Sequence, residues 1–246
     1  MMLEREIEDL GFLPCAEMLP QGSYAQVGLA VDHRTGGYVI CKLCNTETAA
    51  AQQRAWLAHA KARGLRCVPK SLPAQGRWVV YQHARGQTLL QMAEWHATDE
   101  QVTIAAAASV AALFELALHG MTHGDMHPGN IVIDRSAASL IDPGGEAAQR
   151  YADDADGLIA SFVQAGFMSH HAARDCGVRL APTVYRHDLP LRNVAGVVDV
   201  LKALAPRLRQ ASRAARRVVA ARQAPGSGPV VENLTTSPTE RQEGDA

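Results

Sequence analysis

The pattern of apolar residues changes near residue 86, and this change limits the folds that the chain can adopt. Before it, strand-like runs at 23–31, 37–44 and 77–83 dominate, with one Ala-rich helical stretch at 46–63. After it the pattern is helical, and a single pair of short apolar runs interrupts it. Strands and helices segregated along a chain in this way predict an α+β fold.

We expect two lobes and a tail. A small β-rich lobe covers residues 1–85, a helical lobe covers 86–223, and the linker between them lies near Ala84–Gly86. Residues 224–246 are rich in Pro, Gly, Ser and Thr, which is typical of a disordered tail. The helices predicted for the second lobe are 88–95, 99–119, 150–166, 169–175 and 193–222.

Composition excludes several classes of protein. Of the 246 residues 47% are hydrophobic, and 24 Lys and Arg stand against 25 Asp and Glu, which is ordinary for a globular chain. This near-neutral balance argues against a protein that coats nucleic acid. The last predicted helix is rich in arginine, and we interpret that basic stripe as a solvated face.

The five cysteines form no disulfide or zinc framework. Cys41 and Cys44 make one C-x-x-C inside a strand-like run, and no second pair completes a zinc site. We therefore expect buried, reduced thiols, as in the cytoplasm. The charged, helical first residues do not form a signal peptide, although export to a host cell stays open.

The longest apolar stretch, Ile104 to Leu118, predicts a buried helix and no membrane span. It is short for a bilayer and contains Glu115. The stripe expected to face the core consists of Val110, Leu113, Phe114, Leu116 and Leu118.

Residues that carry chemistry gather in HGDMHPGNIVID, from His123 to Asp134, and in LIDPGG, from Leu140 to Gly145. The runs 130–134 and 139–142 predict a short antiparallel pair. Such a hairpin brings Asn130 together with Asp142, which ends the returning strand, while Asp125 lies on the loop before it. Carboxylate and amide oxygens suit Mg²⁺, and a further carboxylate can orient or deprotonate an attacking hydroxyl.

The sequence H-G-D-M-H-P-G-N followed by D-P-G resembles the catalytic loop and metal-binding turn of the protein-kinase-like superfamily. The form H-G-D-x-H-P-x-N is most similar to its atypical branches. These are the aminoglycoside and related small-molecule kinases, the ABC1-type and lipopolysaccharide kinases, and the minimal Bud/RIO-type kinases. The resemblance implies a bilobal kinase-like fold that binds ATP and Mg²⁺.

It also implies roles for individual residues. Asp125 would be the catalytic base or would orient the acceptor hydroxyl, and Asn130 and Asp142 would bind Mg²⁺. Lys42, on the second strand-like run, would hold the α- and β-phosphates. The residues implied to contact the rest of the nucleotide are Gly22 and Ser23 over the phosphates, Val27 after them, and the backbone of Gln82 and Ala84 at the adenine edge.

The chain departs from the protein-kinase pattern at several points. The partner of Lys42 stays open between Glu47, Gln52 and Gln53. An aspartate at the start of the next helix, Asp153 or Asp156, is expected to hold the catalytic loop. At two further positions, Gly124 replaces the arginine of H-R-D and Pro143 replaces the phenylalanine of D-F-G, which argues against control by activation-loop phosphorylation and against a flipping metal turn.

The resemblance therefore implies an ATP- and Mg²⁺-dependent phosphotransferase. The compactness of the chain favours a minimal protein Ser/Thr kinase that phosphorylates a protein hydroxyl. Two alternatives stay open: a kinase of small molecules (an aminoglycoside, a sugar or a lipopolysaccharide), and a pseudokinase that acts as a binding module.

Overall fold

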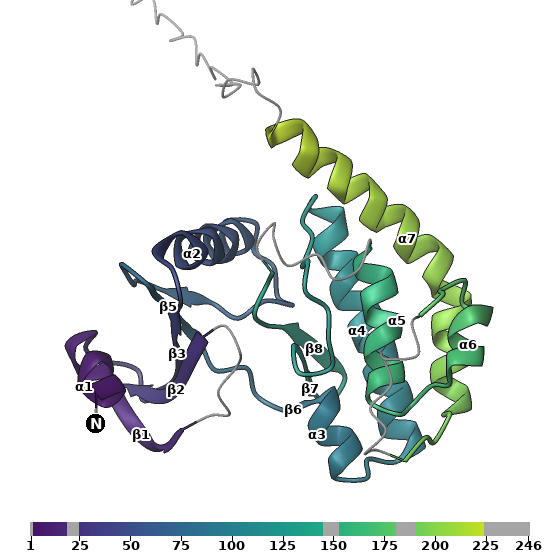
Figure 1. Ribbon diagram of the computed structural model, residues 1–246, viewed down its shortest axis with the longest axis horizontal. Coiled ribbons are helices and arrows are strands. Elements are labelled where there is room, and N and C mark those ends of the chain that lie inside the picture. The colour runs from purple at the N-terminus through teal and green to yellow at the C-terminus, as the bar shows by residue number, and fades with distance from the viewer. Residues whose placement is uncertain (1, 19–24, 145–152, 181–189, 224–246) are drawn as a thin grey trace, which may run out of the picture.

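The computed structural model describes residues 2–18, 25–144, 153–180 and 190–223, and it has two lobes (Figure 1). An antiparallel sheet with two helices forms the N-terminal lobe, and helices with one small sheet form the C-terminal lobe. The predicted α+β bilobal fold is confirmed. The glycine and serine expected to cover the phosphates, Gly22 and Ser23, lie outside the described residues, as does the tail.

The N-terminal lobe contains a five-stranded sheet in the order β1-β2-β3-β5-β4. Every adjacent pair in it is antiparallel. Gly36, with a φ of 68°, lies in the predicted turn between β2 and β3. The elements of this lobe are α1 (Met2–Asp9), β1 (Leu13–Met18), β2 (Ala25–Asp32), β3 (Gly37–Cys44), α2 (Glu47–Ala62), β4 (Ser71–Leu72) and β5 (Trp78–Gln82).

Helix α1 covers the outer face of this sheet. A Cβ on Gly28 of β2 would lie 2.7 Å from Cδ1 of Ile7, so the absence of a side chain at residue 28 lets the helix approach. A separate apolar cluster forms there, and it includes Leu3, Ile7, Phe12, Val39, Cys41, Trp78 and Val80. Because successive strand residues point to opposite faces, Ile40, Lys42 and Cys44 belong to the inner face, toward α2.

The C-terminal lobe follows from well-capped helices. Thr88 with Gln91, and Thr98 with Gln101, form capping boxes at the starts of α3 and α4. The elements are β6 (Gln87–Thr88), α3 (Leu89–Glu94), α4 (Asp99–Leu118), β7 (Ile131–Asp134), β8 (Ala137–Leu140), α5 (Asp154–Gln164), α6 (His170–Asp175) and α7 (Ala195–Gln223). Strands β6, β7 and β8 form a second antiparallel sheet.

The linker between the lobes crosses the second sheet at very close range. Gly86 has a φ of 112°, and a Cβ there would lie 2.0 Å from the carbonyl oxygen of Ile133 on β7. Only glycine fits both this conformation and this contact. Directly after it the chain enters β6, which pairs with β7.

Glu115, the one charged residue of α4 beyond its first turn, joins the two lobes. Its carboxylate accepts the backbone N–H groups of Arg66 and Cys67, at 2.8 and 3.2 Å. The N–H of Leu140 on β8 in turn donates to the carbonyl of Cys67 at 2.7 Å. The segment after α2 is thereby held against the second sheet.

The prediction that Leu118 belongs to the buried stripe of α4 is wrong. Val110, Leu113 and Leu116 are buried, but Leu118 is 80% exposed, because it ends the helix just before the Gly120 turn. By length and composition α4 is apolar enough to cross a membrane, and it is the one such helix in the described residues. The core helix of a soluble protein passes the same test, and half of α4 is buried here.

All five cysteines are free thiols, and Cys41, Cys44, Cys67 and Cys176 are buried, as predicted. Cys41 and Cys44 belong to the two different apolar clusters on either side of the sheet. Burial raises the pKa of the Cys41 thiol to about 12. The cytoplasmic location stays a prediction.

Candidate active site

The β7–β8 hairpin brings Asn130 and Asp142 together, as the sequence predicts. Ile131 pairs with Leu140, and the N–H of Ile141 donates to the carbonyl of Asn130 at 3.0 Å. The side-chain amide of Asn130 donates to the backbone carbonyls of Asp125, at 3.0 Å, and Asp142, at 3.4 Å. This amide therefore ties the loop at 123–130, the predicted catalytic loop, to the turn at 142–144, the predicted metal-binding turn. We expected Asp142 to be the last residue of the returning strand of the hairpin. Strand β8 ends at Leu140, so Asp142 lies two residues beyond it.

Asp142 lies in a strained backbone conformation, with a φ of 52°. Aspartate tolerates the left-handed region better than most residues, and such strain is common at functional sites. One of its carboxylate oxygens, Oδ1, is 3.1 Å from Nζ of Lys42 and 2.9 Å from the Tyr81 hydroxyl, which donates to it. The carboxylate is thus held from two strands of the N-terminal lobe.

Lys42 is nearly buried at the centre of that sheet. It pairs in register with Val27 on β2 and with Val79 on β5. None of the three partners considered from the sequence contacts it in the described residues. Glu47 and Gln52 are exposed on α2, and the ammonium pairs with Asp142 instead.

Gln53 makes a different connection from α2. Its side-chain nitrogen donates to the carbonyl of Pro143 at 3.3 Å, and its oxygen accepts from the thiol of Cys44 at 3.9 Å. A neutral amide therefore links α2 to the turn that follows Asp142. Only a donor can satisfy a carbonyl, so the position favours glutamine over glutamate.

The catalytic loop is braced on three sides. The buried His123 ring donates from Nε2 to the carbonyl of Ile141 at 2.8 Å, so it links the loop to the turn that contains Asp142. Trp56 on α2 packs edge-on against that ring, with centroids 6.1 Å apart, and donates from Nε1 to the carbonyl of Thr122 at 2.8 Å. A Cβ on Gly124, where φ is 82°, would lie 3.2 Å from the carbonyl oxygen of Gly144, so the backbones pass too closely for an arginine here.

The aspartate that holds this loop is Asp154, and the expectation of Asp153 or Asp156 is wrong. The two oxygens of Asp154 accept the backbone N–H groups of His123 and Gly124, at 2.7 and 2.8 Å. Asp153 instead caps α5 by accepting the N–H of Ala155, and Asp156 pairs with Arg209. The helix begins at Asp154, and that register aims the first helical side chain at the loop.

Fewer backbone groups at the end of β5 are available to bond adenine than the sequence predicts. The backbone N–H of Gln82 donates to the carbonyl of Lys70, and that of His83 donates to the carbonyl of Tyr38, both at 2.9 Å. These two donors are therefore engaged within the lobe. A contact between adenine and the carbonyl of Gln82 or the N–H of Ala84 stays a prediction.

The side chains at the hairpin fit Mg²⁺ bound with a nucleotide. Mg²⁺ takes one or two carboxylates and fills its other positions with phosphate oxygens and water. No described residue bonds Oδ2 of Asp142. Asn130 donates from its amide nitrogen to two carbonyls, so its side-chain oxygen is available to a metal ion. Among the described residues no group of three or more His, Cys, Asp and Glu forms a stand-alone metal site.

Comparison with known proteins gives matches among solved structures and two negative results. No family model and no curated protein matches the chain. A solved kinase domain is similar in structure, with a TM-score of 0.42 and 15% sequence identity, over 53% of this chain and 50% of that domain. The chain has a two-lobed α+β fold. The match spans half of that domain, and likeness at this level concerns the fold alone.

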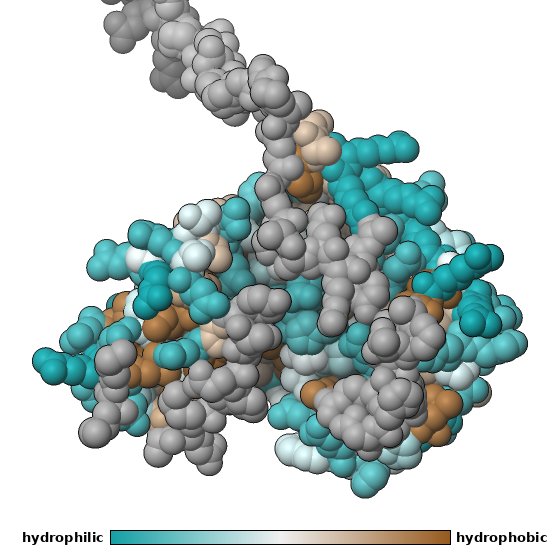
Figure 2. Space-filling model, in the orientation of Figure 1, coloured by the Kyte–Doolittle hydropathy of each residue, from teal (hydrophilic) through white to brown (hydrophobic). Residues whose placement is uncertain are grey.

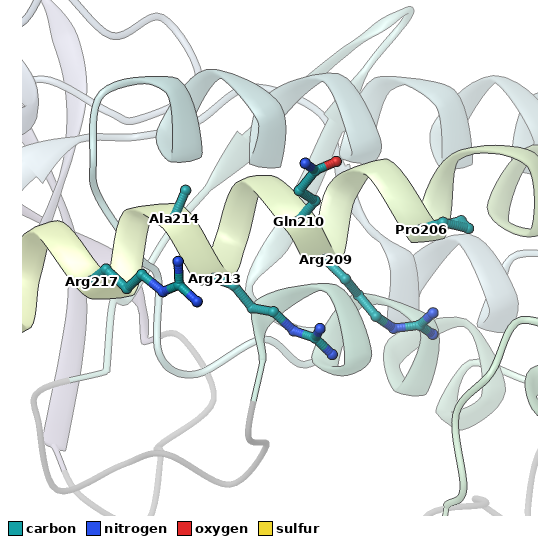
Figure 3. Close-up of a pocket in the computed structure, with 6 residues that line it drawn as sticks. All are labelled: Pro206, Arg209, Gln210, Arg213, Ala214 and Arg217. Carbon is teal, nitrogen blue, oxygen red and sulfur yellow. The ribbon is translucent and has the colours of Figure 1, made fainter.

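Three arginines help to line a groove of about 610 Å³ on α7 (Figure 3). Its lining consists of Pro206, Arg209, Gln210, Arg213, Ala214 and Arg217. Arg209 is structural, because it pairs with Asp156 at 2.8 Å and donates to the carbonyl of Cys176. Arg213 and Arg217 are exposed, as expected of a solvated face. Figure 2 shows hydrophilic side chains along the side of the molecule where α7 lies.

Sequence reasoning missed several residues that hold the site. Tyr81 and Trp56 were not predicted, and Gln53 was considered only as a partner of Lys42. Their hydrogen bonds reach Asp142, Thr122 and Pro143, which lie 61, 66 and 90 residues away along the chain. An isolated aromatic residue or glutamine gives no local pattern from which such a contact could be predicted. The run DDAD at 153–156 was a usable signal, but the register of α5 decides which carboxylate faces the loop.

Proposed function

We propose that the chain is an ATP- and Mg²⁺-dependent phosphotransferase. One observation carries the proposal: Lys42 from the first lobe and Asp142 from the second meet at 3.1 Å, beside Asn130 and the loop that bears Asp125. An ammonium, a carboxylate and an amide at one point between two lobes are the groups that phosphoryl transfer requires.

The chemistry follows from these groups. The acceptor hydroxyl oxygen forms a bond to the γ-phosphorus as the bond from that phosphorus to the bridging oxygen breaks, and ADP leaves. Asp125 is half-buried, and its carboxylate bonds no other described residue, so it is free to orient the hydroxyl and take its proton. Lys42 neutralises charge on the α- and β-phosphates. Bound Mg²⁺, held by Asp142 and Asn130, supplies further charge neutralisation.

A minimal protein Ser/Thr kinase is the acceptor class that we favour. Between Gly86 and His123 the chain forms β6, α3 and α4, and no further helix. The described part of the chain therefore offers no helical insert at that point to enclose a sugar. An aminoglycoside, sugar or lipopolysaccharide acceptor, and a pseudokinase without transfer, are the outcomes to test against.

The test is transfer from γ-labelled ATP in the presence of Mg²⁺, with a protein lysate and an aminoglycoside panel as acceptors. We expect label on protein bands from the wild type and a loss of at least 100-fold in Asp125→Asn, the scale of general-base catalysis. Asp134→Asn is the matched control, since Asp134 is exposed at the end of β7. Its activity should equal that of the wild type.

The other outcomes separate the alternatives. Label on the aminoglycosides alone would move the acceptor to small molecules. ATP binding without transfer to any acceptor would favour a pseudokinase. No nucleotide binding, measured by calorimetry with Mg²⁺, would overturn the proposed function.

A further inference from the structure

The Tyr81 hydroxyl lies at the centre of the site but belongs to none of the groups used above. Tyr81 is on β5 and is only 4% exposed. Its hydroxyl donates at 2.9 Å to Oδ1 of Asp142, the same oxygen that pairs with Lys42. Two donors from neighbouring strands, β3 and β5, therefore share one acceptor atom.

This arrangement divides the work of the carboxylate between its two oxygens. Oδ1 is occupied by the phenol and the ammonium, and no described residue bonds Oδ2. Rotation of the carboxylate would break both bonds to Oδ1, and the hydrogen bond to a charged acceptor is of the stronger kind. The backbone of Asp142 is strained, so the side chain needs such support to keep one orientation.

The lysine alone cannot supply that support during the reaction. Lys42 has to turn toward the phosphates when a nucleotide binds, because it is the one cation from this lobe at the site in the described residues. The phenol carries no charge and has no such second task. A phenol keeps its proton at neutral pH, so the hydroxyl stays a donor.

We propose that Tyr81 is a positioning residue that fixes Oδ1 of Asp142 and leaves Oδ2 for Mg²⁺. This inference rests on the proposed function. It goes beyond that function by assigning the orientation of the metal-binding carboxylate to a neutral group of the N-terminal lobe. The tyrosine contacts neither nucleotide nor acceptor in this role.

The test compares Tyr81→Phe with the wild type in the full chain. The thermal shift produced by a saturating, non-hydrolysable ATP analogue is titrated with Mg²⁺. We expect the Mg²⁺ concentration at half-effect to rise about tenfold in Tyr81→Phe, as for the loss of one hydrogen bond to a charged group. Nucleotide binding in EDTA should change less than twofold. Tyr38→Phe is the control, because it removes an exposed tyrosine hydroxyl from β3 of the same sheet.

Two results would overturn the inference. An unchanged Mg²⁺ requirement would mean that the hydroxyl does not position the carboxylate. A lower requirement would mean that the hydroxyl competes with the metal for it.

A second measurement needs no nucleotide. Urea unfolding of Tyr81→Phe, Asp142→Asn and the double variant gives the coupling between the two side chains. Additive effects would also overturn the inference. If the wild type binds no Mg²⁺-nucleotide, the proposed function fails and the inference fails with it, which differs from failure in the variant alone.

Discussion

Asp154 accepts the backbone N–H of His123 at 2.7 Å, so a carboxylate 31 residues further along the chain fixes the first residue of the catalytic loop. Its second oxygen takes the N–H of Gly124. Asp154 is buried, and water cannot easily replace either bond. The loop is therefore positioned from α5 in the core as well as from the hairpin beside it.

Replacing this carboxylate tests that support. Asp154→Ala leaves two backbone N–H groups without an acceptor, and each costs roughly 1–3 kcal/mol. We expect the free energy of unfolding in urea to fall by about 3 kcal/mol. Asp134→Ala, at an exposed site, should change it by less than about 0.5 kcal/mol. Equal effects of the two variants would contradict the assigned role.

The linker glycine allows a test with a matched partner. Gly86 and Gly76 both have positive φ, but a Cβ on Gly76 meets nothing within 4 Å, whereas on Gly86 it would lie 2.0 Å from the carbonyl oxygen of Ile133. Gly76→Ala should cost about 1–2 kcal/mol, from conformation alone. Gly86→Ala should abolish the cooperative thermal transition, observed by circular dichroism. A mild effect at Gly86 would show that the linker can move away from β7.

The link from α2 predicts an unusual response to glutamate. Gln53→Glu removes the donor to the Pro143 carbonyl and places a negative charge against it. We expect a loss of about 1–3 kcal/mol in unfolding free energy. Gln52→Glu changes its exposed neighbour and serves as the control. If Gln53→Glu stabilises the protein, the new carboxylate has reached Lys42, and the amide link is not required.

Two arginines of the α7 groove are expected to differ in their effect on stability, because only Arg209 pairs with Asp156 of α5. Arg209→Met removes the ion pair with Asp156 and the bond to the Cys176 carbonyl, so we expect a loss of about 2–3 kcal/mol. Arg213→Met, at an exposed position, should stay within about 0.5 kcal/mol of the wild type. Urea unfolding measures both, and a cost at Arg213 as large as that at Arg209 would contradict the solvated-face interpretation.

The buried thiols make stability fall at high pH. The pKa of Cys41 rises from 9.0 in the unfolded chain to about 12, because burial disfavours the thiolate. Between these values the unfolded chain releases the proton and the folded one keeps it. The Cys41 thiol therefore leaves the free energy of unfolding unchanged below pH 9. Above pH 9 it lowers the free energy of unfolding by about 1.4 kcal/mol per pH unit. Unfolding at pH 8 and pH 10 should show a smaller drop in Cys41→Ala than in the wild type.

The sequence predicted what local pattern and spacing determine. The β2–β3 and β7–β8 hairpins, the main helices and the meeting of Asn130 with Asp142 follow from apolar periodicity and short turns. Partners that depend on register and three-dimensional approach did not follow. Lys42 was expected to pair within α2, but its ammonium reaches a carboxylate 100 positions away, and the choice of Asp154 over its neighbours depends on one residue in the start of α5.

The backbone groups predicted to contact adenine also depend on three-dimensional approach. The strand predicted at 77–83 corresponds to β5, which ends one residue earlier, at Gln82. Sequence could not reveal that Lys70 and Tyr38 already take the N–H groups of Gln82 and His83. Those acceptors come from loops and strand ends whose positions depend on the whole sheet.

The close approach of α1 to β2 has a consequence for how this chain can vary. A side chain at residue 28 needs the end of the Ile7 side chain to move, because a Cβ there would lie 2.7 Å from Cδ1 of Ile7. A larger residue at one position therefore requires a smaller one at the other. Among natural relatives of this protein, positions 7 and 28 should covary in volume, even though 20 residues separate them along the chain.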